Sequence, residues 1–87
     1  MSTAVPTSDT IRDIIARVAS LEPASITDTT SLRRDLGVDS LTMLEIGVSI
    51  DYEFRLGLSD LDERLRGLDT VADAVALVEG VLAERVA

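Results

Sequence analysis

An all-α fold, a small four-helix bundle with a long first loop and a short third helix, is predicted by three features of the sequence. Apolar residues recur at helical spacing in three long stretches and one short one, and no alternating run is long enough for a sheet. With one Phe, one Tyr and no Trp, the core must be built from aliphatic residues, a composition that favours helices. The 87 residues, 46% of them hydrophobic and 28% charged, allow one folded domain with one modest core.

The first helix follows a polar lead-in. Residues 1–7 contain Pro6, so we expect a flexible N-terminus there and a single domain over residues 8–87. Ser8 should cap the helix, and Pro23 should end it, because proline disfavours helical geometry in the residue before it. Its apolar face should consist of Ile11, Ile14, Ile15, Val18 and Leu21.

The long first loop covers residues 23–38, a segment dense in Ser, Thr, Asp and Gly. Ile26, Leu32 and Leu36 are its isolated apolar residues, and we expect them to pin the loop onto the core. A loop of this length in a small domain usually signals a function or a missed helix.

The second helix should begin at Ser40, after a flexible turn at Gly37 and a capping Asp39, and run to about Arg55. Its apolar residues form two stripes. Met43, Ile46, Ile50 and Phe54 should face the bundle, whereas Leu41, Leu44 and Val48 lie on the Ser40 side and should stay partly exposed. Tyr52 is expected to be a partly buried packing residue.

The last two helices are predicted from their caps. Ser59 should cap a third helix of about two turns that ends near Gly67. Thr70 and Asp73 have the spacing of a capping box, which predicts a fourth helix. The apolar face of that helix should contain Val71, Ala74, Val75, Val78 and Leu82. Together these elements indicate a small antiparallel bundle.

The composition also limits the chemistry. Cys, His and Lys are absent and all eight basic residues are Arg, so we expect neither intrinsic catalysis nor a metal site. The net charge of -8 argues against nucleic-acid and anionic-membrane partners and favours partners with basic surfaces. Without a leader or a spanning segment in the sequence, we expect a cytoplasmic monomer.

The segment from Asp35 to Leu41 places a serine hydroxyl where a loop meets a helix. Unpaired N–H groups and the positive end of the helix dipole lie at such a junction, so a phosphate ester is tolerated there. Here the tripeptide Asp39-Ser40-Leu41, preceded by Leu36-Gly37, resembles the attachment motif of the acyl carrier protein family.

The resemblance implies that a phosphopantetheinyl transferase moves 4'-phosphopantetheine from coenzyme A onto Ser40, within a binding motif that includes Asp39 and Leu41. Acyl groups would then be carried as thioesters on the thiol of this arm, in fatty-acid or polyketide biosynthesis. The family's four-helix plan covers essentially residues 8–87, and the chain resembles the discrete members, which work with separate enzymes.

Acidic residues cluster after the motif: residues 39–63 hold seven acids and one base, Arg55. By resemblance, the second helix docks onto basic patches of a ketosynthase, an acyltransferase and other acyl-processing enzymes. The candidate docking residues are Leu41, Leu44, Glu45, Val48, Asp51 and Glu53.

Several alternatives stay open. The acidic run can be an ordinary solvated face, and the exposed stripe can be the binding face of a helical adaptor without a cofactor. A peptidyl carrier of nonribosomal synthesis differs chiefly in cargo, and Thr42 stands where many fatty-acid carriers have an acid, which leaves the partners open. The small residues Gly47, Ala72, Ala74 and Ala76 motivate the hypothesis that a pliable core sequesters the acyl chain.

Overall fold

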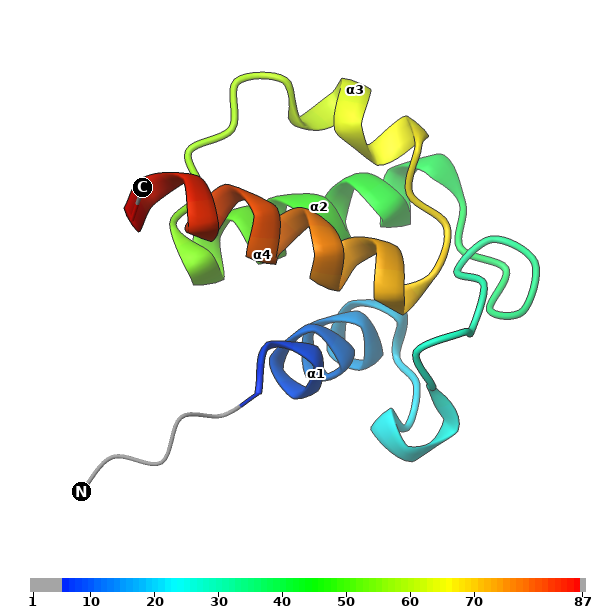
Figure 1. The fold of residues 1–87 in the computed structure, drawn as a ribbon. Coiled ribbons are helices and arrows are strands. Elements are labelled where there is room, and N and C mark those ends of the chain that lie inside the picture. Colours follow the sequence, from blue (N-terminus) through cyan, green and yellow to red (C-terminus); the bar gives the residue numbers. More distant parts are fainter. Residues whose placement is uncertain (1–5, 87) are drawn as a thin grey trace.

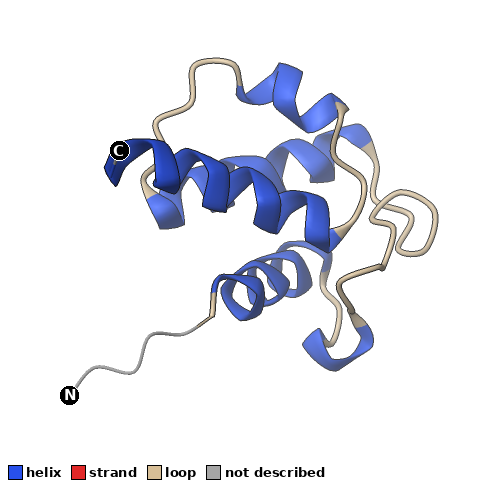
Figure 2. Ribbon diagram, in the orientation of Figure 1, coloured by secondary structure: helices blue, strands red, loops and turns tan. Residues whose placement is uncertain are grey.

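The computed structural model describes residues 6–86, and within this range the protein is helical (Figures 1 and 2). Its elements are α1 (Thr7–Ala19), the short 3-10 helix η1 (Pro23–Ser25), α2 (Ser40–Phe54), α3 (Leu61–Arg66) and α4 (Val71–Val86). The described residues contain no strand, only an isolated bridge between Ser31 and Thr70. The all-α prediction is therefore confirmed. Most of the predicted flexible N-terminus lies outside the described residues.

Both ends of α1 differ from the prediction. The helix begins at Thr7, and the carbonyl of Pro6 accepts the first amide bonds, so the prediction that Ser8 caps it is wrong. It ends at Ala19, because Ser20 adopts the left-handed conformation (φ 60°) and the next amide turns back to the carbonyl of Ala16. Leu21 therefore lies outside the helix and is exposed, not part of its apolar face.

The predicted caps of the later helices had different outcomes. Asp60, not Ser59, occupies the N-cap of α3, and its carboxylate accepts a bond from Arg64 Nε at 2.9 Å. The capping box of α4 is confirmed: the Asp73 amide donates to Thr70 Oγ1 (3.1 Å), and the Thr70 amide donates to Asp73 Oδ2 (3.0 Å). The Asp69 amide also donates to Oδ2, and these amide bonds lower the pKa of Asp73 below its ordinary value.

The helices pack in a simple order: α1 lies against α2 and α4, and α3 lies against α2. Figure 1 shows that α2 and α4 both begin on the right and end on the left, so they run in the same direction. The antiparallel prediction is wrong for this pair, because α3 and its connecting loops return the chain to the end of the molecule where α2 begins.

The core forms where α1, α2 and α4 meet. Its fully buried large side chains are Ile11, Ile15, Leu32, Ile46, Val71 and Val78. Ile26 and Leu32 of the first loop are buried and Leu36 is partly buried, as predicted. Within the described residues, no helix has both the length and the apolar character needed to cross a bilayer.

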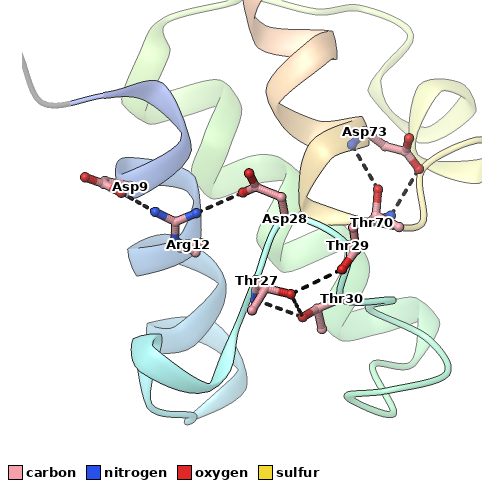
Figure 3. Close-up of polar contacts among 8 residues, drawn as sticks. All are labelled: Asp9, Arg12, Thr27, Asp28, Thr29, Thr30, Thr70 and Asp73. Carbon is pink, nitrogen blue, oxygen red and sulfur yellow. Dashed lines mark hydrogen bonds and ion pairs between the residues drawn. The ribbon is translucent and has the colours of Figure 1, made fainter.

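Hydrogen bonds attach the first loop to α1 and to the chain just before the start of α4. The Leu32 amide donates to the carbonyl of Asp69 (2.7 Å), and Ser31 Oγ donates to the Asp69 carboxylate (2.7 Å). Figure 3 shows Arg12 of α1 between the carboxylates of Asp9 and Asp28, the latter in the loop. The loop is therefore a fixed part of the structure, and it delivers the chain to the start of α2 in a defined position.

Candidate functional site

The start of α2 is built by the three residues before it. Gly37 adopts a positive φ of 67°, which a residue with a side chain rarely does, and buried Val38 donates its amide to the carbonyl of Leu32 (2.9 Å). Asp39 then caps the helix, because its carboxylate accepts the Thr42 amide at 2.8 Å. The backbone bond from Thr42, followed by the side-chain bond from the same residue, lowers the pKa of Asp39.

Ser40 follows the cap as the first residue of α2, and its side chain is exposed, so an approaching enzyme can reach its hydroxyl. The prediction that α2 begins here with an Asp39 cap is confirmed. Asp39 and Leu41 flank the serine and are exposed as well. A phosphate ester on Ser40 would lie near the positive end of the α2 dipole, which fits the group that the motif implies.

The two stripes of α2 face different environments. Met43, Ile46 and Ile50 are buried and Phe54 is partly buried, as predicted. Leu41, Leu44 and Val48 are 66%, 40% and 51% exposed. Tyr52 is 83% exposed, so the prediction that it packs is wrong. It lies four residues after Val48 and therefore on the same exposed side of the helix.

The acidic residues proposed for docking fall into two groups. Glu45 and Glu53 are exposed. The Asp51 carboxylate instead accepts the amides of Gly57 (2.9 Å) and Leu58 (3.0 Å) and so holds the turn after α2. These two roles could not be told apart in the sequence, because the bonds of Asp51 reach six and seven residues ahead in an irregular loop.

Two spaces adjoin α2 on its exposed sides. An open groove of about 500 Å³ is lined by Leu44, Glu45, Val48 and Ser49 of α2 and by Val18 of α1, a residue assigned from sequence only to the first helix's apolar face. A second space of about 140 Å³ lies beside Ser40. It is lined by Arg33, Ser40, Met43, Leu44, Asp62, Leu65 and Arg66. No pattern in the sequence indicates that Arg33 or Arg66 lies near Ser40, since contacts over such separations arise only in the folded structure.

An apolar space lies beneath α3, between α2 and α4, and at about 10 Å³ it has room for at most one water molecule. Gly47 and Ala74 line it, as the hypothesis of a pliable core required, but Ala72 and Ala76 are exposed and do not. A Cβ atom at Gly47 would lie 2.6 Å from a methyl carbon of Leu65, so the glycine permits the close contact between α2 and α3.

Fold and site together define a small helical domain that offers one exposed serine at a helix start. The family described as "Phosphopantetheine attachment site" matches residues 9–78. The meromycolate extension acyl carrier protein of Mycobacterium tuberculosis is 42% identical over 69 residues, which are 79% of this chain and 58% of that protein. The chain thus spans a little over half the length of the relatives from the genus Mycobacterium that it matches.

Two further relatives are covered more completely. The acyl carrier protein of Rhodococcus erythropolis is 39% identical over 71 residues, 82% of this chain and 76% of that protein. Acyl carrier protein 3 of Ralstonia nicotianae is 38% identical over 77 residues, 88% of this chain and 86% of that protein. The chain belongs to the acyl carrier protein family, whose prosthetic group is covalently attached phosphopantetheine.

Proposed function

We propose that Ser40 is the attachment residue for 4'-phosphopantetheine and that this chain carries acyl intermediates among separate enzymes of fatty-acid or polyketide biosynthesis. The observation that carries the proposal is the exposed position of Ser40 at the start of α2, directly after its Asp39 cap. When attached, the arm supplies the thiol to which acyl groups are joined as thioesters.

The residues of the chain act as a platform for that arm. The Ser40 hydroxyl oxygen would form the phosphoester bond to the phosphopantetheinyl group of coenzyme A, with release of its 3',5'-ADP portion and of the hydroxyl proton to the modifying enzyme. Asp39 keeps the helix start in place through its bond to the Thr42 amide. The names of the mycobacterial relatives, which refer to meromycolate extension, support a lipid pathway.

The partners are proposed to be a phosphopantetheinyl transferase and acyl-processing enzymes, such as a ketosynthase and an acyltransferase, with basic docking patches. The exposed apolar side chains of Leu41, Leu44 and Val48 and the exposed carboxylates of Glu45 and Glu53 support this surface. Asp51 is not included, because its carboxylate is engaged by the turn after α2.

The experiment is an intact-mass measurement after incubation with coenzyme A, Mg²⁺ and a broad-specificity phosphopantetheinyl transferase. We expect one phosphopantetheine-sized gain in the wild type and none in Ser40→Ala. Ser59→Ala, which removes another exposed serine, is the matched control and should still gain the mass. A folded wild type that gains no mass with several transferases would overturn the proposal and favour a cofactor-free adaptor.

A further inference from the structure

The space beside Ser40 differs in charge from the rest of this acidic protein. Arg33 and Arg66 contribute two positive charges to its lining and Asp62 contributes one negative charge, so the local sum is +1 in a chain of net charge -8. The two arginines come from the first loop and from the last residue of α3, and they meet only in the folded structure.

Arg33 is held in position by the bundle. One of its terminal nitrogens donates to the carbonyl of Leu68, and the other donates to the carbonyl of Leu65 at 3.2 Å. These bonds fix the guanidinium at the C-terminal end of α3 without neutralising its charge. Arg66 pairs with Asp62 at 3.1 Å, and both of these side chains are largely exposed, so the pair is weak and can rearrange.

Asp39, which directly precedes Ser40 and does not line this space, is negatively charged. The Asp39 carboxylate already accepts the Thr42 amide at the helix start. A phosphodiester on Ser40 would therefore meet an occupied amide and a like charge on the Asp39 side, and two guanidinium groups on the α3 side. Arginine binds phosphate through charge-assisted bonds of matching geometry, so the α3 side is favoured.

We propose that Arg33 and Arg66 hold the phosphodiester of the arm against α3, in the space that they share with Ser40; this inference rests on attachment at Ser40. The apolar residues of the same space, Met43, Leu44 and Leu65, then underlie the first part of the arm. Leu65 also lines the apolar space beneath α3, so the bound phosphate directs the arm toward that region. The two arginines are positioning residues for the prosthetic group.

The test compares the apo and holo proteins by NMR after conversion by the transferase has been verified by mass. We expect the Nε–Hε signals of Arg33 and Arg66 to shift on attachment, while that of Arg64 stays in place. Arg64 is the matched reference, because it also lies on α3 and also pairs with an aspartate four residues earlier, but it does not line the space beside Ser40.

Variants then test whether the arginines contact the phosphate or only lie near it. The measurement is the ³¹P line width of the holo protein. In the wild type and in Arg64→Ala the phosphorus line should be broad, because the phosphate tumbles with the protein. The phosphorus line should narrow in Arg66→Ala, and narrow further when Arg33→Lys is added to that variant. Lysine keeps the positive charge but lacks the planar guanidinium group that can form two parallel bonds to a phosphate. The same narrowing should appear in the wild type at high salt.

The outcomes distinguish this inference from the proposed function. A complete mass gain with unchanged Arg33 and Arg66 signals, or with equal ³¹P lines in Arg66→Ala and Arg64→Ala, overturns the phosphate contact and leaves Ser40 as the attachment residue. A missing mass gain overturns both. Arg66 is exposed, and the Arg66→Ala variant keeps the bonds from Arg33 to the carbonyls of Leu65 and Leu68. The test therefore does not require the fold to tolerate a change at Arg33.

Discussion

The two faces of α2 carry similar apolar side chains in opposite environments. Met43, Ile46 and Ile50 are buried against the bundle, whereas Leu41 and Val48, on the other face of the same helix, are largely exposed. Burial of apolar surface stabilises a fold, so exposed leucine and valine side chains gain little from folding. One face of α2 therefore supports the fold, and the other stays exposed, as the proposed docking surface requires.

The largest effect is expected on the buried face. Ile46→Ala should lower the free energy of unfolding by about 2 to 5 kcal/mol, because it removes buried methyl groups and leaves a cavity. Val48→Ala on the exposed face should change it by less than about 0.5 kcal/mol. Urea unfolding of both variants measures the difference, and equal losses would show that the two faces are not distinct.

A second effect concerns the association with the modifying transferase, and we expect it only for changes on the exposed face of α2. Glu45→Arg should leave stability unchanged and slow modification by the transferase about tenfold at low salt, because it reverses a charge in the proposed docking surface. Glu79→Arg on α4 makes the same change in net charge at another exposed position and is the control. A similar slowing in both variants would mean that only the total charge matters.

A third prediction concerns Gly47, the buried residue at which α2 contacts Leu65 of α3. Gly47→Ala should cost about 1 kcal/mol, because overpacking against Leu65 outweighs the gain in helix propensity. In a Leu65→Ala background the clash is absent, so the same substitution should stabilise the helix by about 1 kcal/mol. Thermal or urea unfolding of the four proteins decides this, and the same sign in both backgrounds would contradict the contact.

The smallest effect on stability is expected at the start of α2, at the Asp39 cap. The folded-state pKa of Asp39 is lowered, mainly by the Thr42 amide, so its contribution to stability is present above the ordinary value of 3.8 and is lost as the pH falls through the lower folded value. Asp39→Asn keeps a capping oxygen but does not titrate. The slope of unfolding free energy against pH below pH 4 should become shallower, and an unchanged slope would argue against the cap.

Local signals explain which parts of the fold could be predicted from sequence. The α2 start, the Thr70 and Asp73 capping box and the core stripe of α2 depend on residues within one or two helical turns, and each is confirmed. The predictions that Ser8 and Ser59 cap their helices were wrong. Several neighbouring residues could begin each helix, and the backbone conformation of the folded chain determines which one does. The prediction that Leu21 belongs to the apolar face of the first helix was wrong, because the left-handed conformation of Ser20 ends α1 before Leu21.

The helical fold and the position of Ser40 at the start of α2 follow from the amino-acid sequence alone, because helix periodicity and capping are local properties of the chain. Three other features could be recognised only in the folded protein: Asp51 holds a turn, Tyr52 is exposed, and Arg33 and Arg66 line the space beside Ser40. These features depend on contacts between segments, or on which side of a helix its neighbours cover. A spacing pattern marks the faces of a helix, but packing alone selects the face that is buried.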